Sequence, residues 1–246
     1  MTEKRRVPWL RIGAESLAIV GSILMAFMID ALWNDYQDRR EEYEIILGLN
    51  EEFAGHVVSI EENMSHVKQI SESIGYLLNL NDVDVDTIDS IELIEQAVFH
   101  ASRTTPPDEL GGGVRDALFA SGKFDLISNV DLREALAEWP ESIDQVEQQR
   151  NAVSGFVMLS LMPYLSSMGV PLAEMRLPGG LRLTDRRMDS EGLGAKYANL
   201  ISDQEYRNLI TLRNWWALGT LMDFQNAADQ AREIAEITKK ELDFAN

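Results

Sequence analysis

One apolar segment near the N-terminus constrains the fold of this chain more than any other feature. In residues 12–33 only Glu15 and Asp30 are charged. A helix of that length rises about 33 Å, enough to cross the hydrocarbon layer of a bilayer, which is about 30 Å thick. We therefore expect a transmembrane helix at 12–33, preceded by a short N-terminus, 1–11, and followed by a larger domain, 34–246.

The flanks of this segment favour a retained anchor over two alternatives that stay open, a cleaved signal peptide and a buried helix of a soluble protein. The uninterrupted apolar part, 16–29, is short enough for either alternative. However, no good pair of small residues stands at the −3 and −1 positions of a cleavage site. The sequence also continues directly into a polar helical pattern that begins with Asp35 and Asp38.

The basic residues around the segment predict its orientation. Four of them lie within residues 1–11, whereas only Arg39 and Arg40 follow the segment closely. By the positive-inside rule, the N-terminus is then cytoplasmic. We expect a single-pass protein of a bacterial inner membrane with its C-terminal domain in the periplasm, a compartment that also suits a chain without cysteine.

Composition excludes several classes of function. The net charge of −19 repels phosphate groups, so a nucleic-acid partner is not expected. The absence of cysteine rules out disulfides, thiolate metal sites and a cysteine nucleophile. The hydrophobic content of 45% is sufficient for a folded core outside the membrane.

The membrane segment carries two sets of residues with an expected role beside the bilayer itself. Four residues near the segment ends suit the headgroup level: Trp9, Glu15, Asp30 and Trp33. Four small residues recur at every fourth position: Ala14, Ala18, Ser22 and Ala26. Such a row allows close approach of a second copy or of another membrane protein, although alanine and serine are also common in membrane helices without a partner.

The rest of the chain is predicted to be all-α. Apolar residues recur in steps of three and four over 41–79, 129–168 and 203–244. Because these segments have similar lengths, we expect them to pack as an elongated antiparallel bundle that continues from the membrane helix. Shorter helices are predicted at 87–102 and 114–121, separated by proline and glycine residues.

Local signals define the ends of these segments. Ser128 and Ser202 each begin a capping-box pattern before a long helix. Pro140 is expected to kink or divide the middle helix. The stretch 169–200 contains several glycines and prolines and reads as a long connection, with alternation at Leu181 and Leu183 typical of a hairpin arm.

Some apolar residues have two interpretations. The apolar run 156–170 includes Met158 and Met162, which suit either the core or an adaptable docking surface. In the last helix, Leu212 and Trp216 are predicted to face inward. Since Trp215 is adjacent to Trp216, both cannot do so, and Trp215 joins Met158 and Met162 as a candidate partner surface.

Signals for chemistry are weak. His56 and His66 do not share a helix face, and the di-iron bundle pattern is incomplete. Asp82, Asp84 and Asp86 resemble the start of a calcium loop, but Thr87 stands where that loop needs glycine. No phosphate loop or nucleophile elbow is present in the sequence, so we expect no metal, no cofactor and no catalytic residue.

Two stretches resemble a family of uncharacterised bacterial single-pass membrane proteins. Residues 15–42 combine an acidic residue, an Ile-Val core, a second acidic residue and a tryptophan before a charged helix. Residues 117–133 contain Ser-Gly-Lys-Phe-Asp-Leu-Ile followed by Leu-Arg. The chain departs from the family pattern at Ser22 and Phe124. The resemblance implies a helical domain outside the cytoplasm and no known activity.

These observations support three hypotheses of different classes. The first is a membrane-anchored helical-bundle protein that acts as an interaction or scaffold protein. The second is a periplasmic ligand-binding sensor domain that signals through a partner. The third is an enzyme, which would need a cleft with convergent carboxylates near 169–200.

Overall fold

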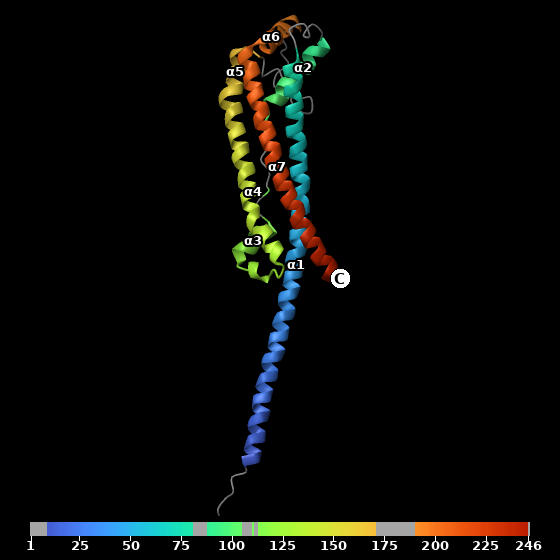
Figure 1. Ribbon diagram of the computed structural model, residues 1–246, viewed down its shortest axis with the longest axis vertical. Coiled ribbons are helices and arrows are strands. Elements are labelled where there is room, and N and C mark those ends of the chain that lie inside the picture. The colour runs from blue at the N-terminus through green and yellow to red at the C-terminus, as the bar shows by residue number, and fades with distance from the viewer. Residues whose placement is uncertain (1–8, 81–87, 105–109, 111–112, 171–189, 246) are drawn as a thin grey trace, which may run out of the picture.

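The computed structural model has helices as its only regular secondary structure in the residues it describes, and no strand, which confirms the all-α prediction. These residues are 9–80, 88–104, 110, 113–170 and 190–245, without the side chains of 9–14, 16, 88–90, 190, 191 and 245. The first helix, α1 (Trp9–Asn79), has 71 residues and is unbroken. It is about 106 Å long, and its N-terminal part extends below the other helices as a stalk (Figure 1).

Three long helical segments form the bundle. The upper part of α1 packs against α7 (Gln204–Ala245), and α7 also packs against α4 (Val130–Phe156). These neighbours run antiparallel, with α7 between α4 and α1 in the view of Figure 1. The predicted antiparallel bundle continuing from the N-terminal helix is therefore confirmed.

The core is divided into two clusters along the bundle. The lower cluster joins α1, α4 and α7 around Phe53, Trp139 and Phe224. The upper cluster adds residues of α2 (Ile88–Ala101) and α6 (Ser190–Ser202), including Ile94 and Tyr197. Both clusters are built from residues spaced three and four apart, the pattern from which the helices were predicted.

Two short elements close the base of the bundle. The helix α3 (Val114–Ser121) ends at Gly122, whose φ of 71° is the left-handed conformation that favours glycine. A 3-10 turn, η2 (Phe124–Leu126), follows and contacts α1. These elements lie beside the point where α1 leaves the bundle (Figure 1).

Pro140 was expected to kink or divide the middle helix, and the expectation of a division is wrong. Pro140 lies inside α4 and does not divide it. The interruption comes later, at a π-helical turn (Val157–Leu161) before the short α5 (Met162–Ser167). It precedes Pro163, which has no N–H to offer the carbonyl of Leu159.

The expected connection at 169–200 is shorter than predicted. Its last part belongs to α6, in spite of Gly192 and Gly194, because Leu193, Tyr197 and Leu200 are buried on one face of this helix. The expected hairpin arm at Leu181 and Leu183 lies outside the described residues, as do the acidic loop 82–87 and the basic terminus 1–8.

Candidate interaction surface

The stalk of α1 exposes apolar side chains on all sides. Every described side chain from Leu17 to Arg40 is exposed. The helix is long and apolar enough to cross a membrane. Its large exposed apolar side chains are those of Leu17, Ile19, Val20, Ile23, Leu24, Met25, Phe27, Met28, Ile29, Leu32 and Trp33.

The small-residue row lies on this exposed stalk. Ala18, Ser22 and Ala26 are exposed, and the Ser22 hydroxyl donates a hydrogen bond of 2.8 Å to the Ala18 carbonyl of its own helix. Ser22 therefore needs no outside partner in an apolar environment. The side chains of Ala14 and Trp9 lie outside the described part.

The predicted interface residues that are described are also exposed. They are Glu15, Asp30 and Trp33. Trp33 lies 6.1 Å from Tyr36, measured between ring centroids. Both aromatic rings mark the upper end of the apolar segment, where indole and phenol groups suit a headgroup layer.

A second exposed apolar feature lies on α7, on the face turned away from the core. Leu212, Trp215, Leu218 and Met222 follow one another in steps of three or four. Trp215 is 73% exposed and Met222 69%. We call these four residues the α7 row.

The α7 row includes one residue whose predicted orientation was wrong and two that the sequence did not single out. Leu212 was expected to face inward but is 43% exposed. Leu218 and Met222 were overlooked. Their i, i+4 spacing on the face opposite Phe224 was the available signal.

The candidate partner residues have different positions. Trp215 and Met158 are exposed, the latter on the π-helical turn, which contacts α7. Met162 instead packs partly buried against the upper core. Trp216, next to Trp215, was expected to face inward and is half-buried.

An acidic groove continues the same face of α7 toward the stalk. It lies between α4 and α7 and has a volume of about 570 Å³. Six of its eleven lining residues are carboxylates, and none is basic: Asp131, Glu134, Glu138 and Glu141 on α4, with Asp229 and Glu233 on α7. Sequence reasoning missed this groove because its two sides are far apart in the chain.

Three helices meet at Glu52 and Arg115. The Glu52 carboxylate accepts a hydrogen bond of 3.0 Å from the backbone N–H of Arg115 in the first turn of α3, and lies 3.5 Å from Nε2 of His56. Burial alone would raise the pKa of Glu52, but the facing His56 ring and the backbone N–H groups of Arg115 and Val114 lower it. Glu52 thus secures α3 on α1 as an external cap.

Arg115 also explains how α4 tolerates Pro140. A proline inside a helix leaves the carbonyl four residues earlier without its N–H partner, here Leu136. The Nε of Arg115 donates a hydrogen bond of 3.0 Å to this carbonyl. The adjoining hollow of about 180 Å³, lined by Glu52, Arg115 and Trp139 among others, is therefore part of a structural junction.

We expect Arg115→Met to destabilise the bundle by about 1–3 kcal/mol, because it leaves the Leu136 carbonyl without a partner. In a Pro140→Ala background, the alanine N–H supplies this partner, so the same substitution should cost about 1 kcal/mol less. Chemical unfolding of the four variants forms a double-mutant cycle. Equal costs in both backgrounds would contradict the proposed role of Arg115.

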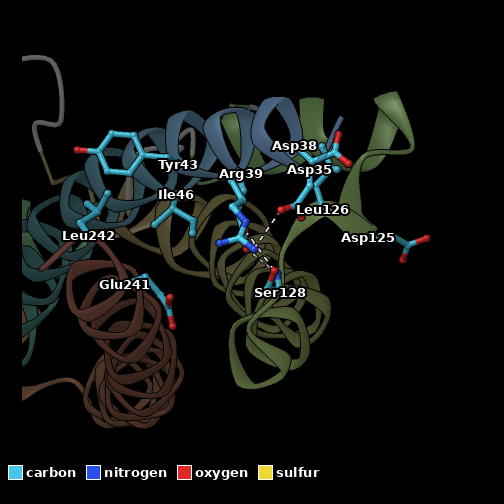
Figure 2. Close-up of a pocket in the computed structure, with 11 residues that line it drawn as sticks. Asp35, Asp38, Arg39, Tyr43, Ile46, Asp125, Leu126, Ser128, Glu241 and Leu242 are labelled. Carbon is cyan, nitrogen blue, oxygen red and sulfur yellow. Dashed lines mark hydrogen bonds and ion pairs between the residues drawn. The ribbon is translucent and has the colours of Figure 1, made fainter. Parts of the chain in front are cut away.

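A hollow of about 530 Å³ lies where α1 leaves the bundle (Figure 2). Its carboxylates are largely engaged within the protein. Arg39 pairs with Asp35 at 3.1 Å, and Glu42 accepts a hydrogen bond of 2.6 Å from the backbone N–H of Ser128. The first of these contacts lies within α1, and the second joins α1 to the bundle base, which gives the hollow a structural role.

One buried cation stands out in the upper half. Arg213 is 1% exposed, and its Nη2 donates a hydrogen bond of 3.0 Å to the Arg103 carbonyl. Among the residues that the structure describes, its Nε and Nη1 have no hydrogen-bond partner. Burial lowers the pKa of Arg213 to about 10, because the interior of the bundle disfavours the charged guanidinium.

The described residues offer no metal-binding cluster. No three His, Asp or Glu side chains of the described ranges converge closely enough to hold an ion. His56 stacks on Trp139 with 5.5 Å between ring centroids, and His66 is exposed. Comparison of the chain with family models, curated proteins and solved structures finds no match.

Proposed function

We propose that this chain is a membrane-anchored interaction protein, in which α1 crosses a bacterial inner membrane and the helical bundle faces the periplasm. One observation carries the proposal. The apolar side chains of residues 17–33 are exposed around the whole circumference of a helix that continues without a break into the bundle core. A partner helix covers one side of such a segment, whereas lipid covers all sides.

The energy of covering this surface supports the anchor. Burial of one Val, Leu, Ile, Phe or Met side chain is worth about 1.5–3 kcal/mol, and eleven large apolar side chains are exposed here. The combined free energy of transferring these side chains from water into lipid is on the order of 15 kcal/mol, which is comparable to the total stability of a typical domain. This free energy is gained only if the stalk is removed from water.

Charge supports the proposed orientation. Four basic residues precede the apolar segment within residues 1–11 and suit the cytoplasmic side. The bundle carries a large excess of acidic residues, which anionic headgroups repel. In this arrangement Ala18, Ser22 and Ala26 face lipid and offer a contact row for a second copy or another membrane helix.

Protease access tests this proposal. In intact spheroplasts, added protease should degrade the bundle, while intact cells should protect it. The chain should resist extraction from membranes by alkaline carbonate, and mass spectrometry should find residues N-terminal to Leu17 retained. Protection of the bundle in spheroplasts would show that the orientation is the reverse of the one proposed. A mature N-terminus beyond Ile29 would show that the segment is a cleaved signal peptide.

A further inference from the structure

We propose that the outward face of α7, from Leu212 to Glu233, is the docking site for a cationic amphipathic helix of another protein. The proposal rests on the proposed interaction function and names the chemistry of its partner. It is carried by two adjacent features of one helix face, the α7 row and the acidic groove.

The apolar half of the site is a local feature of an otherwise polar face. Trp215, Leu218 and Met222 lie within about 60° of one another around the helix axis, and Leu212 lies about 60° further round, beyond Trp215. The same face is polar before the row, at Asn208, and after it, at Asn226. An apolar row bounded in this way is typical of a contact surface.

The acidic half lies directly in line with the row. Asp229 follows Met222 by seven residues, as Met222 follows Trp215, so the three residues lie one above the other on α7. Across the groove, Glu134, Glu138 and Glu141 form a parallel acidic row on α4. These three residues are exposed and make no ion pair with a described cation.

One of the six groove carboxylates is partly neutralised. Arg232 lies 2.7 Å from Asp229 and 2.7 Å from Glu61 of α1. The other five keep the groove strongly negative. Among the described residues, no three of these carboxylates lie close enough together to hold a metal ion. Their spacing of three and four residues matches a helix that presents Lys or Arg at the same intervals.

The geometry defines the partner. The site extends over 212–233, about 32 Å along α7. A helix of about 20 residues fills it when one end carries an apolar face and the other end carries basic residues at helical spacing. This arrangement corresponds to recognition of an amphipathic helix along an open surface.

Charge argues against a second copy as the occupant. Two copies anchored in one membrane are related by an axis along the membrane normal, so their α7 helices run parallel. Pairing through the α7 row then places Glu233 and Asp229 of each copy beside the same residues of the other. A basic helix relieves this negative charge, whereas a second copy doubles it.

A peptide probe tests the site on the full chain in lipid nanodiscs. The probe is a fluorescein-labelled peptide of 21 residues with leucines on one face of its first half and lysines at helical spacing in its second half. We expect saturable binding by fluorescence anisotropy that weakens as salt rises. Trp215→Ser, and separately the triple variant Glu134→Gln, Glu138→Gln, Glu233→Gln, should each weaken binding at least tenfold.

Matched controls separate the site from general attraction to an acidic protein. Leu93→Ser removes an exposed leucine of α2, and the triple variant Glu51→Gln, Glu62→Gln, Glu72→Gln removes the same charge from α1. Both should bind the probe within twofold of the parent, and all variants should keep the parent's thermal unfolding temperature. An equal loss of affinity for the probe in the control variants and the site variants would overturn the proposal.

Two other results would also overturn it. A peptide of the same composition with scrambled order should bind at least tenfold more weakly, and equal binding would reduce the effect to net charge. A nanodisc-embedded dimer that Trp215→Ser dissociates would assign the row to a second copy. Either result leaves the membrane anchor standing, because protease access tests the anchor independently.

Discussion

Removal of residues 1–34 should transfer the protein from the membrane fraction to the soluble fraction without unfolding the bundle. All described side chains of this segment are exposed, and the first described hydrogen bonds between α1 and the bundle base come later, at Glu41 with Lys123 and at Glu42 with Ser128. We expect nearly complete loss of membrane association after cell fractionation. The thermal unfolding temperature, followed by circular dichroism, should change by only about 1 °C relative to the full chain in detergent.

A reciprocal fusion provides the control for this deletion. Residues 1–34 joined to a soluble reporter should place the reporter in the membrane fraction. A truncated bundle that stays membrane-bound would show that another surface binds lipid or a membrane partner. A truncated bundle that unfolds would mean that the stalk contributes to the core, contrary to its exposure.

Trp139→Ala should destabilise the bundle by about 3–5 kcal/mol. Trp139 is 2% exposed and packs edge-on against Phe53, with ring centroids 5.0 Å apart. Its loss leaves a cavity between α1 and α4 that the rigid helices fill only partly. For a domain of this size the unfolding temperature should fall by about 6–20 °C.

The matched substitution Trp215→Ala removes the same side chain from an exposed position of the same bundle. We expect it to change stability by at most about 0.5 kcal/mol. Thermal and urea unfolding of both variants measure the difference. Similar losses in the two variants would show that Trp215 is covered in the folded protein.

Much of the fold could be predicted because helical periodicity records which face is buried. The spacing of Leu49, Phe53 and Ile60 indicated the inner face of α1, and all three are buried. The helix at 114–121 was predicted with its exact bounds, since glycines flank it on both sides. Such local signals depend only on neighbours in sequence.

Helix caps were predicted one residue too early in both long helices. Asn129, not Ser128, accepts the hydrogen bond from the Leu132 N–H, while Ser128 donates to Glu42. In the same way Asp203, not Ser202, accepts from the Tyr206 N–H. Asn and Asp are as good as serine at this position, and the contact of Ser128 with α1 is invisible in the sequence.

The candidate site depended on information that periodicity does not carry. Glu138 and Asp229 line one groove although 91 residues separate them. The support of Pro140 by Arg115 likewise joins two helices, so the sequence alone predicted a kink or a break at Pro140. For α7, the extra apolar residues on the outer face resembled core positions, which is why Leu212 was assigned to the wrong side.

If α1 crosses the membrane as proposed, its unbroken course also sets the height of the α7 row above the bilayer. Ser71 donates a hydrogen bond to Asn214, so the neighbouring Trp215 lies level with a point on α1 that is 38 residues beyond Trp33. At 1.5 Å per residue this height is about 57 Å. In the proposed arrangement, a partner anchored in the same membrane therefore needs a spacer of similar length, whereas a soluble partner on that side of the membrane does not. The length of α1 thus selects between partners by their reach.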